Sequence, residues 1–162
     1  MSQELSISEV KELLGKEIGI SDWITMTQES IDYFAEATGD FQFIHTDPVR
    51  AAAETPFGGT IAHGFLSLSL LSAMSYNCLP KIREQTMCIN YGFDKIRFVA
   101  PVKSGARVRG RFAVADARLR SAGMLMVSYD AMVEIEDESK PALTAFWQTI
   151  IRFQPKDRPA DI

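Results

Sequence analysis

The sequence predicts an α+β protein in which a curled sheet wraps around one central helix. Helical patterns occupy the first half of the 162-residue chain and extended patterns the second half, which is the order typical of α+β proteins. The helix expected to start at Gly64 is apolar on all sides, and such a helix is normally buried. In a chain this short, only a sheet folded around the helix can bury it. With no linker, repeat or low-complexity segment, we expect one domain over residues 1–162, with its core at about 20–154.

Two helices and a short strand are expected in the first quarter of the chain. Ser8 is placed to cap a short helix that ends near Gly15, and residues 23–27 have the pattern of a short strand. Thr27 then precedes apolar residues at helical spacing, so we expect it to cap a second helix. Gly39 ends this helix, because glycine adopts the left-handed conformation that follows many helices without steric cost.

A glycine-rich loop separates a third helix from the central one. Asp47 followed by Pro48 predicts a helix start, because the first turn does not need the N–H group that proline lacks. Residues 55–60 contain one proline and two glycines, and we therefore expect a loop there. Serines along the Gly64 helix can bond their hydroxyls to the preceding turn, so they are compatible with its burial.

The second half of the chain supplies the strands. Extended patterns cover residues 87–91, 95–99, 107–115, 124–134 and 143–153. Gly92 indicates a bulge or a close backbone approach. Residues 116–123 and 137–141 are expected to form hairpin-like connections. Apolar and mainly basic residues alternate in 107–115, as in a half-exposed strand, and the basic ones are more typical of a solvated face than of phosphate contacts.

The bulk composition argues against several classes of function. A formal net charge of −4 provides no general attraction to nucleic acid. No apolar run reaches the length of about 18 residues that suggests a transmembrane helix, so we expect no membrane-spanning segment. The N-terminal segment lacks the apolar core of a secretory signal, and the two cysteines form neither a disulfide framework nor a metal-binding pattern. We therefore expect a cytoplasmic protein with two unreactive thiols.

The candidate catalytic residues lie between the second helix and the central one. Asp40 directly follows the expected helix end, and His45 comes five residues later, just before the next helix. Across a loop, this spacing lets both side chains face one pocket, where a carboxylate and an imidazole form a general acid/base pair. From spacing alone, His45 could equally be a core histidine bonded to a backbone carbonyl. The only other histidine, His63, is 18 residues further on, and this spacing matches no standard zinc site.

Gly64 has a second feature that bears on chemistry. It starts the central helix, and the free N–H groups at a helix N-terminus can stabilise a developing oxyanion. Glycine also leaves the approach to these groups open. The alternative is that Gly64 only permits tight packing of the helix start.

Two segments together resemble the hydratase-2 motif of MaoC-like (R)-specific enoyl-CoA hydratases. They are residues 39–48, GDFQFIHTDP, and residues 61–64, IAHG, and the similarity extends from about Trp23 to Phe153. The resemblance implies the hot-dog fold, an antiparallel sheet curled around a central helix, in a protein that is usually a homodimer. The chain departs from the motif at Gln42-Phe43, where many members have Asn-Pro.

The resemblance also implies site residues and a reaction. Asp40 and His45 would be the catalytic pair, the amide of Gly64 the oxyanion donor, and Ser72 a supporting residue of the substrate site. His63 would then be a structural residue beside the oxyanion site. The implied enzyme is a hydro-lyase of fatty acid metabolism that adds water reversibly to a trans-2-enoyl-CoA, giving a (3R)-hydroxyacyl-CoA, with no metal or cofactor.

Three alternatives to this reaction stay open. The first is a (3R)-hydroxyacyl dehydratase that acts on thioesters of acyl carrier protein rather than of CoA. The second is an acyl-CoA thioesterase of the same fold. The third is a non-catalytic module that binds acyl thioesters, which would have no need of an acid/base pair.

Overall fold

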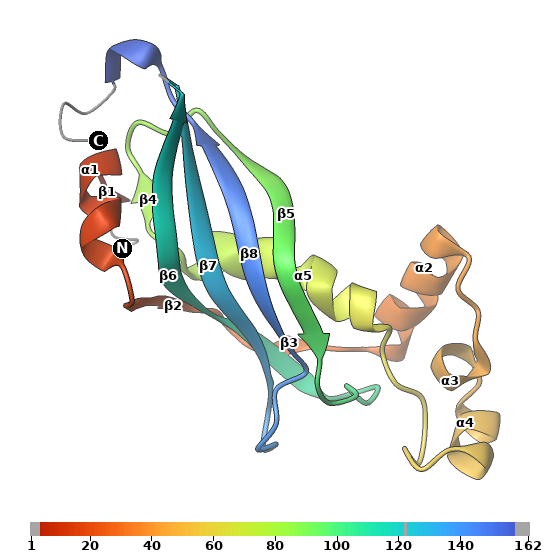
Figure 1. Ribbon diagram of the computed structural model, residues 1–162. Coiled ribbons are helices and arrows are strands. Elements are labelled where there is room, and N and C mark those ends of the chain that lie inside the picture. The colour runs from red at the N-terminus through yellow and green to blue at the C-terminus, as the bar shows by residue number, and fades with distance from the viewer. Residues whose placement is uncertain (1–3, 122, 158–162) are drawn as a thin grey trace.

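The computed structural model describes residues 4–121 and 123–157 (Figure 1). Its helices are α1 (Ile7–Val10), α2 (Gln28–Thr38), α3 (Phe43–Thr46), α4 (Pro48–Glu54) and α5 (Gly64–Cys78), with short 3-10 turns at Lys11–Leu13 and Pro155–Asp157. Its strands are β1 (Glu4–Leu5), β2 (Glu17–Ile20), β3 (Ile24–Thr25), β4 (Lys81–Ile82), β5 (Met87–Phe98), β6 (Arg107–Ser121), β7 (Met124–Ile135) and β8 (Leu143–Arg152). None of these helices has both the length and the hydropathy needed to cross a membrane.

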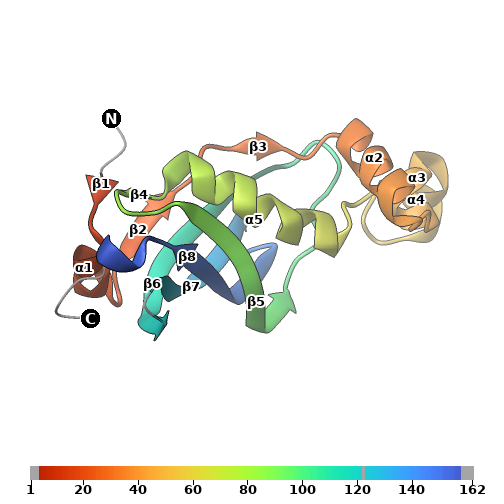
Figure 2. The same ribbon diagram turned by 90° about the horizontal axis from the view of Figure 1, so that it is seen from above.

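The long strands form one antiparallel sheet that curls around α5. The strand order is β2-β6-β7-β8-β5, and β3 extends the sheet by pairing with β6. Seen from above, α5 lies along the sheet, and α2, α3 and α4 form a separate lobe beyond its N-terminal end (Figure 2). This arrangement confirms the predicted α+β class and the central helix.

The inward-facing side of β6 brings the sheet close to α5. Val108, Phe112 and Val114 are fully or almost fully buried, as the alternating pattern predicted. Gly110 lies between them, and a Cβ atom there would be 2.8 Å from the ring of Phe112 and 3.1 Å from the Cβ of Met74 on α5. The absence of a side chain at Gly110 therefore permits the close approach of helix and sheet.

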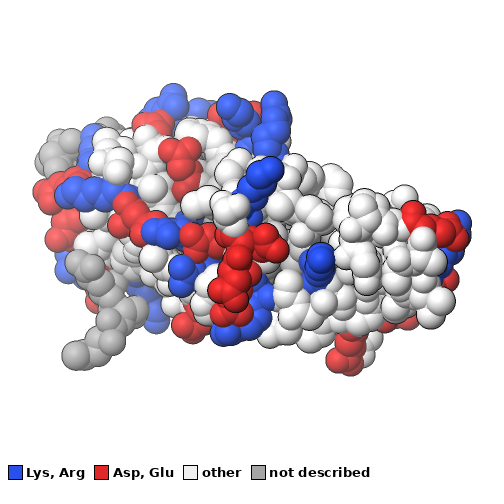
Figure 3. Space-filling model, turned by 90° about the horizontal axis from the view of Figure 1, so that it is seen from below, with Lys and Arg blue, Asp and Glu red and all other residues white. Residues whose placement is uncertain are grey.

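The opposite side of β6 is a charged, solvated face. Its arginines pair with glutamates: Arg107 with Glu136, Arg109 with Glu134, and Arg111 with Glu17, each at 2.7 Å. Seen from below, basic and acidic side chains are interleaved over the sheet half of the molecule, and no large patch of one sign is visible on this face (Figure 3). The pairing agrees with the prediction of a solvated face rather than a phosphate-binding one.

Several predicted boundaries are wrong in detail. The N-cap of the first helix is Ser6, not Ser8, because Ser6 and Glu9 form a reciprocal capping box. The two strands expected on either side of Gly92 are one continuous strand, β5, since bulges near Gly92 and Lys95 preserve its pairing with β8. The connection expected over residues 116–123 is mostly strand, because β6 pairs with β7 as far as Ser121.

The central helix is buried on one side only. Ser67, Leu71 and Met74 are buried, whereas the side chains of Phe65 and Tyr76 are 65% and 78% exposed. The expectation that α5 is covered all round is therefore wrong for a single chain. One curled sheet covers one side of a helix, and the apolar residues of the other side remain uncovered.

Candidate active site

The end of α2 places Asp40 in a loop. Thr27 caps the helix as predicted, since its hydroxyl accepts a hydrogen bond from the N–H of Ser30. Gly39 follows the helix with φ of 76° and donates its N–H to the carbonyl of Ala35 at 2.8 Å. The left-handed residue at this point turns the chain out of the helix. Asp40 comes directly after it, and its side chain is 55% exposed.

His45 lies on the single-turn helix α3, which the sequence pattern did not predict. Asp47 ends this turn and caps α4, accepting a hydrogen bond from the N–H of Arg50 at 2.9 Å, with Pro48 in the first turn as expected. Two short helices meeting at one residue orient His45 inward. Its side chain is buried, with 7% of its surface exposed.

The tautomer of His45 follows from its hydrogen bond. Its Nδ1 lies 2.7 Å from the carbonyl oxygen of Ile61, and a carbonyl can only accept, so Nδ1 carries the hydrogen and Nε2 the lone pair. Burial lowers the pKa of His45, and His63 lowers it further, while the bond to Ile61 and the charge of Asp40 act in the opposite direction. A neutral imidazole with a free Nε2 is suited to accept a proton.

His63 is the most enclosed member of the cluster. It directly precedes α5, and only 2% of its surface is exposed. Its Nε2 donates to the backbone carbonyl of Asp40 at 2.9 Å. Its ring stacks on that of His45, with centroids 3.8 Å apart and planes inclined by 26°. It also contacts the ring of Phe34 at a centroid distance of 5.0 Å.

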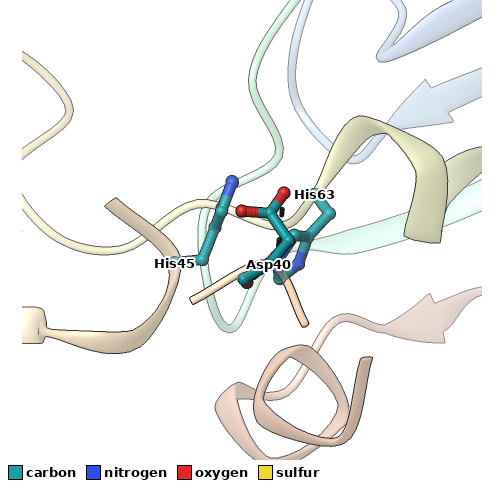
Figure 4. A group of neighbouring side chains, drawn as sticks. All are labelled: Asp40, His45 and His63. Carbon is teal, nitrogen blue, oxygen red and sulfur yellow. Dashed lines mark hydrogen bonds and ion pairs between the residues drawn. The ribbon is translucent and has the colours of Figure 1, made fainter. Parts of the chain in front are cut away.

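The structure brings the predicted pair together with His63. One nitrogen from each histidine and one carboxylate oxygen of Asp40 lie within 4.8 Å of one another. The Asp40 carboxylate is 4.0 Å from His63 Nε2. Figure 4 shows the three side chains converging from the loop after α2, from α3 and from the start of α5. An exposed carboxylate beside a buried neutral imidazole is an arrangement that can orient a water molecule.

An apolar cleft of about 400 Å³ opens beside His45. Its walls come from the segment before α5, the start of α5, and the end of β5 with the segment that follows it: Ile61, Ala62, Gly64, Phe65, Ser67, Phe98, Val99, Ala100, Pro101 and Val102, together with Ala142. Gly64 in this wall is in the first helical turn, where N–H groups have no partner within the helix. The cleft thus brings an apolar surface, the first residue of α5 and His45 together. A larger hollow of about 600 Å³ lies on the outer face of the sheet, away from these residues.

The cluster is poorly arranged for a metal ion. Two histidines and one carboxylate are a common ligand set, but each ring already donates one N–H to a carbonyl. The remaining lone pairs lie in two ring planes inclined by only 26° and stacked 3.8 Å apart. Such planes do not meet within the roughly 2.1 Å of a metal–nitrogen bond. Binding a metal would therefore require a ring to turn and break its hydrogen bond.

Ser72 is not brought to this cluster. It lies eight residues beyond Gly64, about 12 Å along a helix, and is not among the residues that line the cleft. Its hydroxyl instead accepts a hydrogen bond from the side chain of Asn90 on β5 at 3.0 Å. The two cysteines are free, and burial raises the pKa of Cys78 to about 11 and that of Cys88 above its usual value. Both thiols are therefore poor nucleophiles.

Gln28 is a site residue that sequence reasoning missed. Its amide nitrogen donates to the carbonyl of His45 at 2.7 Å, and its amide oxygen accepts from the hydroxyl of Thr60. It therefore ties the start of α2 to α3 and to the loop before α5. A glutamine in the first turn of a helix is ordinary, so no signal in the sequence distinguished it.

Comparisons with known proteins agree with this fold. Residues 9–134 match the family model described as a MaoC like domain. Nodulation protein N of Rhizobium meliloti is 61% identical over 156 residues, covering 96% of this chain and 97% of that protein. The 3-hydroxyacyl-thioester dehydratase Z of Mycobacterium tuberculosis is 41% identical over 148 residues, covering 91% and 95% of the two chains.

The same agreement holds for solved structures. A monoamine oxidase regulatory protein from Archaeoglobus fulgidus superimposes with a TM-score of 0.76 at 25% sequence identity, covering 96% of this chain and 99% of that one. The family match spans more than half of the chain and includes α5 and the strands from β2 to β6, with most of β7. The chain therefore belongs to the MaoC-like dehydratase family and has its hot-dog fold.

Proposed function

We propose that this protein is an (R)-specific enoyl-CoA hydratase, which adds water reversibly to a trans-2-enoyl-CoA and yields a (3R)-hydroxyacyl-CoA. The observation that carries the proposal is the placement of Asp40 next to a buried, neutral His45 that lines an apolar cleft. The relative named as a 3-hydroxyacyl-thioester dehydratase supports a thioester substrate. No metal or redox cofactor is part of the proposed reaction.

In the proposed mechanism, Asp40 and His45 hold one water molecule between them. One proton of the water passes to this pair as its oxygen bonds to C3 of the enoyl group. A proton from the pair then goes to C2, so that one water is added in total. Acid/base assistance of this kind contributes about 10²–10⁴ in rate.

The start of α5 has a separate role in the mechanism. As water adds, negative charge develops on the thioester oxygen, and the N–H of Gly64 would stabilise it. A single oxyanion donor contributes about 10²–10³ in rate. Because the cleft holds both Gly64 and His45, one bound thioester could meet both groups.

The carrier group of the thioester is the open part of the proposal. We infer CoA, with the thioester of acyl carrier protein as the alternative. The arginines on the outer face of β6 are paired with glutamates, so they do not support either carrier. We expect a place in fatty acid metabolism and a cytoplasmic location, where the two free thiols would stay reduced.

The experiment is incubation of the protein with crotonyl-CoA. A hydratase lowers the absorbance of the conjugated enoyl thioester and produces (3R)-hydroxybutyryl-CoA, identified by chiral chromatography. Release of free CoA thiol would point instead to a thioesterase. Binding of crotonyl-CoA with no change in absorbance would point to a non-catalytic module, and the (3S) product would contradict the stereochemical part of the proposal.

We further propose that the protein is a homodimer. Among the described strands, β5 pairs only with β8, so its other edge is free. Three apolar side chains on this strand, Met87, Ile89 and Tyr91, are 42–57% exposed, and a long apolar edge is a template for pairing with another chain. The uncovered side of α5, with Phe65 and Tyr76, adds apolar surface. Sedimentation should give twice the monomer mass, and a monomer at micromolar concentration would refute this proposal.

A further inference from the structure

A three-residue segment holds both members of the proposed catalytic pair. The carbonyl of Ile61 accepts the hydrogen bond from His45 Nδ1, and the side chain of His63 donates to the carbonyl of Asp40. The segment is itself fixed by backbone bonds, from Ile61 N–H to Ile44 and from Ala62 N–H to Val102. Residues 61–63 therefore fix the positions of both Asp40 and His45 through hydrogen bonds. Gly64 follows them immediately.

The position of Asp40 depends more on its hydrogen bond to this segment than the position of His45 does. The Asp40 carboxylate accepts a long hydrogen bond, 3.4 Å, from the N–H of Gln42. It lies 4.0 Å from His63 Nε2, and its side chain is more than half exposed. The backbone of Asp40 is held by the 2.9 Å bond from His63. Backbone bonds hold the chain before and after Asp40, from Gly39 N–H to Ala35 at 2.8 Å and from His45 N–H to Gln42 at 2.9 Å. Among the described residues, the bond from His63 is therefore the one that holds the backbone of Asp40 itself.

The surroundings of His63 keep its donor directed at Asp40. Its ring contacts the rings of His45 and Phe34, and its Nδ1 is buried without a hydrogen-bond partner among the described residues. Because the Asp40 carbonyl can only accept, Nε2 carries the hydrogen and Nδ1 the lone pair. A ring flip would exchange Nε2 with Cε1, and the N–H bond to that carbonyl would be lost.

We propose that His63 is a positioning residue, which fixes the Asp40 carboxylate relative to His45 through its Nε2–H bond and exchanges no proton in the reaction. This inference rests on the proposed hydratase function. It differs from the structural role expected from the sequence, because it links His63 specifically to the rate of the chemical step. A misplacement of about 1 Å in a catalytic group can cost a factor of about 10² in rate.

Two amide substitutions at His63 test whether the hydrogen-bond donor at the position of Nε2 matters apart from the aromatic ring. The amide nitrogen of His63→Gln reaches about the position of Nε2, whereas that of His63→Asn stops near Nδ1. With crotonyl-CoA, we expect His63→Gln to keep kcat within about fivefold and His63→Asn to lose about 10²-fold, with KM changed by less than about threefold in both. Circular dichroism and unfolding curves confirm that the compared variants are folded.

Two kinetic results would overturn the proposal. Equal large losses of kcat in both variants would mean that His63 itself transfers a proton. Unchanged kcat in both would mean that the bond to Asp40 has no bearing on catalysis.

A second measurement does not depend on activity. The chain has only two histidines, so long-range ¹H–¹⁵N NMR spectra can assign both tautomers. We expect Nδ1–H for His45 and Nε2–H for His63, and ¹⁵N relaxation should show residues 39–42 rigid in wild type and His63→Gln but mobile in His63→Asn. The opposite tautomer of His63, or a loop equally rigid in both variants, would refute the positioning role. An inactive wild type with the expected NMR result would refute the hydratase proposal alone.

Discussion

The imidazole of His45 stacks on that of His63 at a centroid distance of 3.8 Å, and each ring donates one N–H to a backbone carbonyl. The two carbonyls set opposite tautomers, so that His45 presents Nε2 and His63 presents Nδ1 as the free lone pair. Orientation of a catalytic histidine is often assigned to a carboxylate partner. Here the backbone of Ile61 provides it, and the Asp40 carboxylate is left available for a water molecule.

The lowered pKa of His45 predicts a specific dependence of stability on pH. Burial is its main cause, and in the unfolded chain the pKa returns to about 6.5. As the pH falls below this value, the unfolded state takes up a proton first, so stability falls as the pH drops through the lower, folded-state pKa. We expect wild type to lose more unfolding free energy than His45→Gln between about pH 7.5 and pH 5. Parallel urea-unfolding results for the two proteins would contradict this.

Replacing Gly64 by alanine tests the packing at the cleft. A Cβ atom at this position would lie 2.9 Å from the ring of Phe98, so the ring would have to move, at a cost of about 1–3 kcal/mol. We expect Gly64→Ala to lower both stability and hydration rate. Adding Phe98→Ala should make Gly64→Ala neutral or stabilising, measured by urea unfolding of all four proteins. If the changes in unfolding free energy of the two substitutions simply add, the alanine side chain at position 64 does not clash with the ring of Phe98.

Gln28 should affect stability and catalysis together. Gln28→Met has a similar length but leaves the carbonyl of His45 and the buried hydroxyl of Thr60 without this partner. Each unsatisfied buried group costs about 1–3 kcal/mol, and the rate of hydration should fall because α3 is less well fixed. Gln85→Met is the matched control, since Gln85 is exposed and its side chain makes no hydrogen bond to the described residues. Equal losses of stability and rate in both variants would argue against a role for the hydrogen bonds of Gln28.

Gly110 tests the approach of α5 to the sheet. In Gly110→Ala the new methyl would contact Phe112 and Met74 at 3.1 Å or less, and we expect a loss of about 1–3 kcal/mol in unfolding free energy. At Gly92 on β5 a Cβ atom would have no neighbour within 4 Å among the described residues. Gly92→Ala should therefore have a much smaller effect. A similar loss at both positions would contradict the packing described for β6.

The sequence predicted those features that depend on local backbone chemistry. Thr27, Gly39 and Asp47 each begin or end a helix where expected, because caps and left-handed glycines act over a few neighbouring residues. The proximity of Asp40 and His45 was predictable for the same reason, since only five residues of chain separate them, although His45 lies on α3 and not in the loop. The alternation in β6 likewise follows from two-residue geometry.

Features that depend on distant contacts could not be predicted. The continuity of β5 through Gly92 depends on its pairing with β8, a partner that the pattern does not identify. The capping box of Ser6 and Glu9, by contrast, is local, and its S-x-x-E spacing is present in the sequence. The spacing of 18 residues between His45 and His63 gives no indication that their rings stack. The exposed side of α5 has the composition of a buried surface, and only the extent of the sheet shows that one chain leaves it uncovered.

The most direct test of the central claim is the turnover of crotonyl-CoA by wild type, Asp40→Asn and His45→Gln, each shown to be folded by its unfolding transition. Both substitutions nearly preserve size and polarity but remove the carboxylate or the imidazole. We expect rapid hydration by wild type and a loss of about 10²–10⁴ in kcat for each variant. Turnover within about twofold of wild type in either folded variant would contradict the assignment of Asp40 and His45 as the acid/base pair.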